Sequence, residues 1–468
     1  MTSSSLRVVS LAAGLGLLGG CVTPLTQPPR LSPADNAAAL SSRSLHDEGL
    51  HRFLVQNLGH EPAQWDFETL SWVAFYYHPS LDLARTQWAT AHAALTTAGA
   101  RPNPTLSVTP GYSSNPDAGV SPWFPAVNFD FLLETSGKRD LRTAVEKFST
   151  EAARLNVLSA AWQVRSDLRH ALIEAIADEH RLPFLRAQTD AQRQLLSLLE
   201  KRLAAGSITS LELSPARIAL LKSEAALVDL QGQIGVARSH VAQALGVPLT
   251  ALDGVSLVDL PPPPTLSPEA LTVARRESLQ SRADVLAALA HSESAHAALQ
   301  LEAAKRYPDV HLGPGYQWDQ GQNKWTLGLT VELPLFNRNE GPLAEATARH
   351  GEAAAQLNAT QALVIAAIDN AVTAQSAATA QLDHVRRLRV ELEKQVALVQ
   401  TRFAGGGADQ VDLQTARLDL LATDLTLADA ADAAAVAAGQ LEDALQVPFQ
   451  NLNAVATAPR NVTQSRTP

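Results

Sequence analysis

Apolar side chains repeat every seven residues in two stretches of this chain, one beginning near residue 211 and one near residue 411. A seven-residue repeat predicts a helix that packs along one apolar seam. Each stretch carries two such repeats, offset by two residues and therefore about 200° apart around the helix. The repeats are Leu211, Ile218 and Ala225 with Leu213, Leu220 and Leu227, and Val411, Leu418 and Leu425 with Leu413, Leu420 and Leu427. Opposed seams predict a neighbour on each side, as in a wall or tube of helices; burial in a globular core is the alternative.

Alternation of apolar and polar residues predicts four short β-strands. The segments are 105–112, 126–133, 309–316 and 325–333. In the last, the residues on one face are Trp325, Leu327, Leu329, Val331 and Leu333. Four strands cannot close a barrel, since the smallest barrels need about eight, and an open edge is not tolerated in lipid. Two chains could supply eight strands and three could supply twelve. The strands and the two-seamed helices together predict an oligomer with a β-barrel at one end and a helical tube at the other, which suggests a conduit.

The longest predicted helices, 139–204 and 343–404, are rich in good helix formers and contain only Pro183 and Gly351 as breakers. Each would be about 90 to 100 Å long at 1.5 Å per residue. We expect Pro183 to kink the first helix. A glycine turn follows each helix and reverses the chain between antiparallel helices.

Local sequence similarity indicates an internal duplication. The segment TAHAAL at 90–95 returns as SAHAAL at 294–299, and TPGY at 109–112 returns as GPGY at 313–316, a shift of about 200 residues. Each copy is expected to hold a helix, two strands, the long helix, the turn and a last helix, the first helices being 68–100 and 271–305. We place the first repeat at 66–258, a Pro-rich connector at 259–270, the second repeat at 271–450 and a C-terminal tail at 451–468.

The N-terminus carries the features of a secretory signal. Arg7 precedes a short apolar run with small residues at its end, so residues 1–20 are interpreted as a signal peptide. The run ends in LLGGC, which resembles the lipobox of bacterial lipoproteins. Cys21 is the single cysteine, and an ordinary buried thiol is the alternative to its lipidation. Residues 21–65 are then a lipidated periplasmic segment, and Val22 in place of an aspartate directs such lipoproteins to the outer membrane.

Composition and motifs argue against catalysis and nucleic-acid binding. The net charge of −10 disfavours nucleic acid as a partner. The 13 histidines are dispersed, with no H-E-x-x-H spacing, and no G-x-S-x-G or phosphate-binding loop stands in a strand-to-helix context. His92 and His296 share a repeat position and are interpreted as structural. We therefore expect no enzyme, no metal site and no cofactor beyond the lipid on Cys21.

From about 65 to 450 the chain resembles the TolC family of outer-membrane efflux channels. The features that carry the resemblance are the duplicated halves, the R-x-x-x-G turns followed by an acidic residue and A-R, and the lipobox. The resemblance implies a mainly α fold with a small transmembrane β part. It implies a trimeric α-barrel of very long helices, capped by a shared 12-stranded β-barrel with four strands per chain.

Two stretches where a strand leads into a long helix resemble the CzcC-type metal-efflux branch. They are ETSGKRDLR at 134–142 and LPLFNRNEG at 333–341, and interfacial anchoring near lipid head groups is the alternative role. Their candidate residues are Gly137, Lys138, Arg139, Arg338, Asn339 and Gly341.

In the TolC family the glycine turns form the periplasmic tip, where the tube narrows and docks onto an adaptor. The corresponding residues are Arg202, Gly206, Arg217, Arg402, Gly405, Gly406, Gly407 and Arg417. Family positions around the aperture correspond to Glu212 and Asp412. Their carboxylates, repeated in a trimer, would favour cations. The alternative role of these two residues is to stabilise the helix N-terminus. Phe403 and Ala408 stand where gating members carry a tyrosine and an arginine, so that latch is not expected here.

The resemblance implies a lipid-anchored homotrimeric outer-membrane channel that extends into the periplasm. It would passively conduct substrates from an inner-membrane pump, of RND type, and a periplasmic adaptor, with metal cations as one candidate cargo. A type I protein-secretion channel is an alternative, and so is a periplasmic coiled-coil scaffold without a pore. Trp123, Trp318 and Trp325, as interface anchors on the strand segments, argue against the scaffold.

Overall fold

The computed structural model describes residues 32–116, 118–260 and 268–446, which fall into two units. The first unit contributes helix α2 (Pro33–Ser41), whose N-cap Ser32 accepts a hydrogen bond from the amide of Asp35. The second unit is described from Arg43 to Gln446. The expected signal peptide, Cys21 and the 451–468 tail lie outside the described residues.

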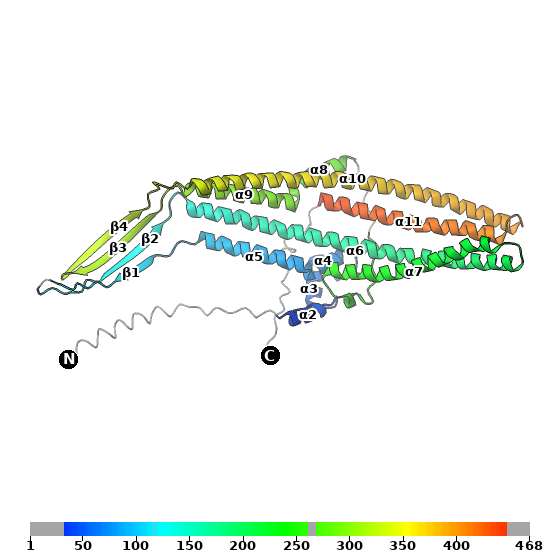
Figure 1. Ribbon diagram of the computed structural model, residues 1–468, viewed down its shortest axis with the longest axis horizontal. Coiled ribbons are helices and arrows are strands. Elements are labelled where there is room, and N and C mark those ends of the chain that lie inside the picture. Colours follow the sequence, from blue (N-terminus) through cyan, green and yellow to red (C-terminus); the bar gives the residue numbers. More distant parts are fainter. Residues whose placement is uncertain (1–31, 117, 261–267, 447–468) are drawn as a thin grey trace. The chain divides into compact units, whose positions relative to one another are not determined.

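The second unit is built mainly from helices (Figure 1). They are α3 (Glu48–Leu58), α4 (Phe67–Tyr77), α5 (Pro79–Gly99), α6 (Lys138–Ala204), α7 (Ser210–Leu245), the 3₁₀ helix η2 (Leu249–Leu252), α8 (Pro268–Ser281), α9 (Ala283–Ala304), α10 (Glu340–Ala404) and α11 (Gln410–Leu445). The two long helices are confirmed, with 67 residues in α6 and 65 in α10, or about 100 Å each at the α-helical rise. Helix α6 continues through Pro183.

The expectation of one helix before each strand pair is wrong, because each is divided in two. His78 is extended (φ −70°, ψ 124°) between α4 and α5, since the proline ring of Pro79 disfavours helical geometry in the residue before it. Arg282 is extended (φ −59°, ψ 134°) between α8 and α9, with no proline after it. Its guanidinium instead binds the Asp284 carboxylate at 2.7 Å and donates to the carbonyl of Ala444. A distant contact therefore stabilises the second break.

All four predicted strands are confirmed, in one antiparallel sheet of order β1-β2-β3-β4. The strands are β1 (Thr105–Thr109), β2 (Ala126–Leu133), β3 (Val310–Asp319) and β4 (Gln322–Val331). Gln320 (φ 50°) and Gly321 (φ 80°) form the two-residue turn between β3 and β4, as a type I′ hairpin requires. Strands β1 and β4 lie at the two open edges of the sheet within the chain.

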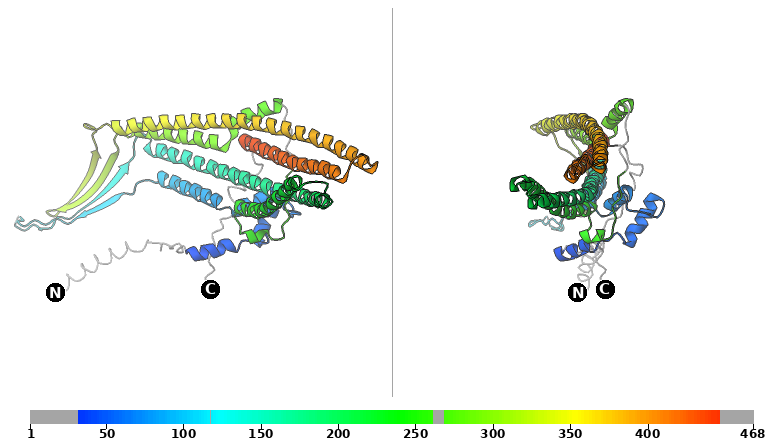
Figure 2. Two further views of the ribbon diagram at one scale, coloured as in Figure 1. Left: turned by 45° about the vertical axis from the view of Figure 1, so that its right-hand side comes forward. Right: turned by 90° about the vertical axis from the view of Figure 1, so that its right-hand side faces the viewer.

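The helices of the second unit lie side by side in two tiers (Figure 1). Next to the sheet the order of packed helices is α5, α6, α9, α10; toward the glycine turns it is α7, α6, α11, α10. Seen end-on, the helices follow a curved layer (Figure 2, right). The same order of elements therefore occurs twice, as α5-β1-β2-α6-α7 and as α9-β3-β4-α10-α11.

The apolar core lies where the two tiers meet. Its fully buried members, from α3, α4, α5, α6 and α7, include Leu50, Phe75, Leu81, Leu168 and Leu245. A smaller cluster joins α9, α10 and α11 through Val285, Ile368 and Leu441. The ends of the long helices reach beyond this core in both directions (Figure 1).

Candidate functional site

The first glycine turn closes helix α6 with a Schellman motif. Gly206 is left-handed (φ 71°), and its amide donates to the carbonyl of Leu203 at 2.9 Å. The next amide, of Ser207, donates to the carbonyl of Arg202, also at 2.9 Å. This pair of bonds satisfies carbonyls that a helix end leaves open.

The second turn has the same geometry, although it contains three glycines. Gly406 takes the left-handed conformation (φ 74°), and the amide of Gly407 donates to the carbonyl of Arg402 at 2.8 Å. Gly405 has φ −88°, which any residue can adopt. A Cβ on Gly405 or Gly407 would meet only ordinary contacts at 3.6 Å or more. The reversal therefore requires glycine at 406 alone.

The predicted aperture residues are both members of a capping box. The Glu212 carboxylate accepts from the amide of Thr209 at 2.7 Å, and the Asp412 carboxylate accepts from the amide of Asp409 at 2.9 Å. The bond from the Thr209 amide lowers the pKa of Glu212. This is the helix-terminal role that stood as the alternative to an aperture. For Glu212 the two roles are compatible, because a capping carboxylate with a lowered pKa keeps its negative charge.

An ion pair that the sequence did not predict joins the two turns. Arg202, at the end of α6, binds the carboxylate of Asp409, at the start of α11, at 2.5 Å. The hydrogen bond from Arg202, followed by bonds from the amides of Asp412 and Val411, lowers the pKa of Asp409. Asp409 could have been found from its spacing, since an acidic residue three positions before Asp412 is the signature of an N-cap.

The remaining candidate arginines at the turns have smaller roles. Arg217 lies 3.5 Å from Glu200, across the first helical hairpin. Arg402 donates to the carbonyl of Gly407 at 3.0 Å. Among the described residues Arg417 forms no ion pair. The turn residues thus lie together at one end of the long helices (Figure 1).

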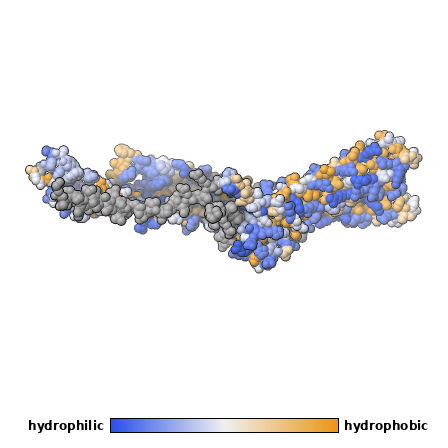
Figure 3. All heavy atoms as spheres, turned by 90° about the horizontal axis from the view of Figure 1, so that it is seen from below, coloured by the Kyte–Doolittle hydropathy of each residue, from blue (hydrophilic) through white to orange (hydrophobic). Residues whose placement is uncertain are grey.

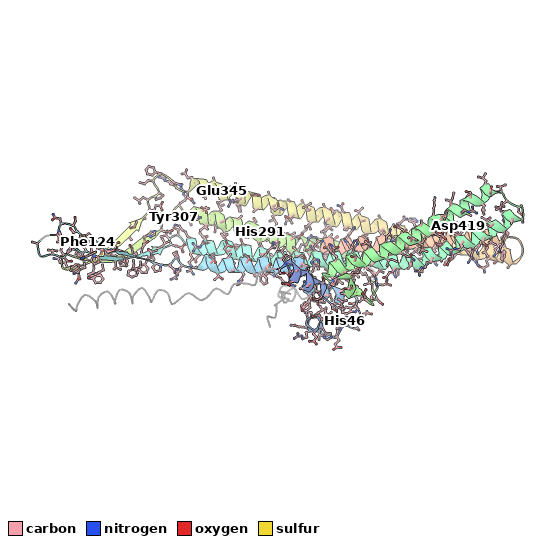
Figure 4. The ribbon with its side chains drawn as sticks, turned by 60° about the horizontal axis from the view of Figure 1, so that its bottom comes forward. His46, Phe124, His291, Tyr307, Glu345 and Asp419 are labelled. Carbon is pink, nitrogen blue, oxygen red and sulfur yellow. The ribbon has the colours of Figure 1, made fainter. Side chains whose placement is uncertain are left out.

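The opposite ends of the long helices hold the second predicted group, led by the buried Lys138. Its ammonium donates to the carbonyl of Tyr307 at 2.6 Å and to the carboxylate of Asp309 at 2.8 Å. Tyr307 lies at the boundary between the helices and the sheet (Figure 4). Gly137 (φ 68°) and Asn339 (φ 61°) are the left-handed N-caps of α6 and α10. Lys138 therefore connects the first repeat to the second at the point where strands become helices.

Other residues of these junctions divide into bonded and exposed groups. The guanidinium of Arg139 donates to the carbonyl of Gly99 at 2.7 Å, and the amide side chain of Asn339 donates to the carbonyl of Glu302 at 2.8 Å. Arg338 and Gly341 are exposed. The predicted list missed an ion pair within the same motif, Arg142 with Glu134 at 2.6 Å, in which the arginine also binds the end of α5.

The sheet has one apolar and one polar face. Cross-strand partners such as Leu106 with Phe129, Phe131 with Leu312, and Leu312 with Leu329 share the apolar face. Its exposed members are Leu106, Val108, Phe129, Phe131, Leu133, Trp325, Leu327 and Leu329. The opposite face carries Thr105, Ser107, Asn128, Asp130, His311, Gln317, Lys324, Thr326 and Thr330. Nothing among the described residues covers either face, so one of them presents a continuous apolar surface to its surroundings.

Two helices also carry apolar residues that nothing in the described chain covers. On α7 they include Leu211, Ile218, Leu221 and Val228; on α10 they include Leu363, Leu388 and Leu398. Figure 3 shows apolar residues interspersed among polar ones at its right-hand end, over the helices next to the turns. Helices α7 and α10 are the two edges of the tier next to the turns.

The described ranges contain neither a cluster of metal ligands nor a helix that could span a membrane. Across residues 32–116, 118–260 and 268–446, no group of three or more His, Cys, Asp or Glu side chains is placed to hold a metal ion. None of the helices described there is both long and apolar enough to cross a membrane.

This chain is similar in sequence to two known bacterial proteins. The chain is 24% identical over 256 residues to the cobalt-zinc-cadmium resistance protein CzcC of Cupriavidus metallidurans, an alignment that spans 53% of this chain and 60% of CzcC. It is 21% identical over 457 residues to the probable outer membrane lipoprotein SilC of Salmonella typhimurium, which covers 91% and 95% of the two chains.

Solved structures and the family match agree with these relatives. The outer membrane protein VceC of Vibrio cholerae superposes with a TM-score of 0.68 and 25% identity, over 82% of this chain and 97% of VceC. Residues 75–247 and residues 274–446 each match the family described as outer membrane efflux protein. The chain belongs to the outer membrane efflux protein family.

Proposed function

We propose that three copies of this chain form a passive channel through the outer membrane and across the periplasm. The observation that carries the proposal is the sheet, which has two open edges, one exposed apolar face and one polar face. Unpaired edge strands are not stable in lipid, so in a trimer the edges of the three sheets would pair with one another. Pairing β1 of one chain with β4 of the next would close twelve strands, with the apolar face toward lipid and the polar face toward water.

The helical part supports the same closure. Helix α7 at one edge and helix α10 at the other both expose apolar side chains. A contact between α7 of one chain and α10 of the next joins two different surfaces, and such contacts close into a ring when the rotation fits. The curved layer of helices (Figure 2) then becomes one third of a tube.

The turn ends of the helices are the proposed periplasmic mouth. Glu212 and Asp412 would place six carboxylates there in a trimer, and such a ring favours cations over anions. The exposed turns around Gly206 and Gly406 are the surface we assign to a periplasmic adaptor, coupled to an inner-membrane pump of RND type. Cys21 lies outside the described residues; its lipidation rests on the lipobox and on the naming of SilC as a probable lipoprotein.

Metal cations are the cargo class that the relatives favour. The name of CzcC refers to cobalt, zinc and cadmium resistance. This chain contains one cysteine and one methionine, which leaves no set of soft sulfur ligands, so it would conduct the ion without storing it. The apolar sheet face argues against a periplasmic scaffold, because a scaffold in water would not expose a continuous apolar surface.

Two neighbouring residues of β4 test the channel directly. Leu327 lies on the apolar face and Thr326 on the polar face, and both are exposed within the chain. Leu327→Lys should reduce insertion into the outer membrane sharply, because a lysine facing lipid costs about 2–4 kcal/mol near the bilayer centre. Thr326→Lys should insert normally and lower the cation conductance in planar bilayers. Equal insertion of both variants, or no conductance from the wild-type trimer, would overturn the proposal.

A further inference from the structure

The polar face of the sheet holds a histidine and an aspartate in direct contact. His311 is the second residue of β3, and Asp130 lies in the adjacent strand β2. The Nδ1 atom of His311 is 3.0 Å from Oδ2 and 3.1 Å from Oδ1 of Asp130. Both side chains are about half exposed, at 41% and 47%. The pair is therefore open to whatever fills the space on this face.

The chemistry of the pair fixes which imidazole nitrogen is available. An ionised carboxylate can only accept hydrogen bonds, so Nδ1 of His311 must be the donor. In the neutral ring Nε2 then carries the free lone pair. A metal-binding histidine characteristically donates its other nitrogen to a carboxylate in this way, which orients the ring and raises its basicity.

The neighbours of His311 leave its imidazole partly exposed. The next residue of β3 on the same face is Gly313, and the partner of His311 in β4 is the small Thr330. On the other side the partner of His311 in β2 is Leu132, which has no donor to compete for the ring. The remaining charged pair on this face, Asp319 with Lys324, lies at the far end of the β3-β4 hairpin.

We propose that His311, held by Asp130, is a transient binding site for borderline transition-metal cations such as Zn²⁺ on the water-filled face of the channel. The inference rests on the proposed channel function and deepens it by naming a binding site for the proposed metal cargo. Imidazole prefers Zn²⁺ and its neighbours in the first transition row to Mg²⁺ or alkali ions. One protein ligand per chain, completed by water, binds weakly enough for the ion to leave, which conduction requires.

The chain offers a matched control on its helices. His240 of α7 binds the Glu174 carboxylate through Nδ1 at 3.0 Å, with both side chains about half exposed. This pair copies the geometry of His311 and Asp130 but lies away from the sheet. His240→Gln therefore removes an equivalent imidazole without touching the polar face of β3.

The test measures ion current through full-length trimers in planar bilayers, with Zn²⁺ added at micromolar concentration and Mg²⁺ as the comparison ion. We expect Zn²⁺ to block wild type and the His240→Gln variant equally, and Mg²⁺ to block neither. His311→Gln should lose the Zn²⁺ block, and Asp130→Asn should need about tenfold more Zn²⁺ for the same block. Normal zinc-free conductance would show that both sheet variants are folded.

The contradicting results are separable from failure of the channel itself. Zn²⁺ block of His311→Gln at the wild-type concentration would overturn the inference and leave the channel standing, and the pair would then be a cross-strand contact only. Block lost in His240→Gln would also overturn it, by moving the site to the helices. Absence of current from wild-type trimers would overturn the channel and this inference together.

Discussion

Helices α7 and α11 occupy equivalent places in the two repeats and carry the same double seven-residue repeat, yet their surroundings differ. Helix α11 packs between α6 and α10, and its outer seam of Val411, Leu418 and Leu425 is half-buried. Helix α7 packs against α6 at the edge of the layer. Its matching residues are exposed, Leu211 at 81% and Ile218 at 51%. The same apolar pattern is satisfied within the chain in one repeat and left open in the other.

The difference shows what a seam pattern means in a duplicated chain. The sequence specifies that a helix needs two neighbours, and it does not say whether both belong to the same molecule. The exposed seam of α7 and the exposed apolar residues of α10 lie at the two opposite edges of the helical layer. We infer that these edges meet between copies.

The inner seams, which begin at Leu213 in α7 and at Leu413 in α11, should respond alike to substitution by a charged residue. Leu213 and Leu413 are 4% and 6% exposed. Replacing either by Asp buries an unpaired charge, and we expect each to lower the free energy of unfolding by at least about 3 kcal/mol. Urea denaturation followed by circular dichroism measures both. A large difference between the two variants would contradict the equivalence of the inner seams.

The outer seams should respond differently. Ile218→Asp places a charge on a surface that is open in the chain, so the helices should remain folded while trimers are lost. Leu418→Asp falls on a half-buried seam and should weaken the chain before assembly. Circular dichroism combined with mild gels of the detergent-extracted protein separates the effects. A full trimer yield from Ile218→Asp would show that the α7 seam faces water.

The three glycines of the second turn should separate into one required and two replaceable positions. Gly406→Ala forces a side chain into the left-handed region and should cost about 1–2 kcal/mol. Gly405→Ala has an ordinary φ and should be neutral or stabilising, by up to about 1 kcal/mol. Thermal unfolding of the two variants beside wild type gives the comparison. Similar losses from both would mean that the turn needs its glycines for another reason.

The ion pair between the turns should have the smallest effect, and it should depend on pH. Because Arg202 lowers the pKa of Asp409 in the folded chain, the pair stabilises above the unfolded carboxyl pKa of about 3.9. That contribution is lost as the pH falls through the lower folded value. Arg202→Gln should cost less than about 1 kcal/mol at neutral pH, since both side chains are substantially exposed, and nothing in strong acid.

The control for this prediction is the equivalent arginine of the second repeat. Arg402 donates to a backbone carbonyl and forms no ion pair within the described residues, so Arg402→Gln should show no change of effect with pH. Urea midpoints at neutral pH and below pH 4 would be measured for both variants. A pH-independent loss in Arg202→Gln would show that the contact with Asp409 contributes nothing.

Elements governed by local periodicity were predictable from the sequence. Strand β2 has the predicted bounds, and the long helices begin and end within a few residues of the expected positions. Contacts between distant segments were not predictable. The helix break at Arg282 depends on the carbonyl of Ala444, and the role of Lys138 depends on the carbonyl of Tyr307.

The candidate site follows the same rule. The glycine turns were predicted from composition and spacing, and the left-handed conformations of Gly206 and Gly406 agree with that prediction. The ion pair of Arg202 with Asp409 joins two turns that lie side by side only in the folded chain. The open edge of α7 could not be predicted either, because α7 and α11 carry the same seven-residue pattern and differ only in which helices lie beside them.

In the assembled channel, we infer, the exposed seam of α7 is covered by α10 of another copy. A photoreactive benzoyl-phenylalanine at position 218, activated in the intact outer membrane, tests it most directly. We expect covalent links between chains that map to α10, whereas the same residue at position 418 should give links within one chain only. Links from position 218 that stay within the chain, or that reach only other proteins, would contradict it.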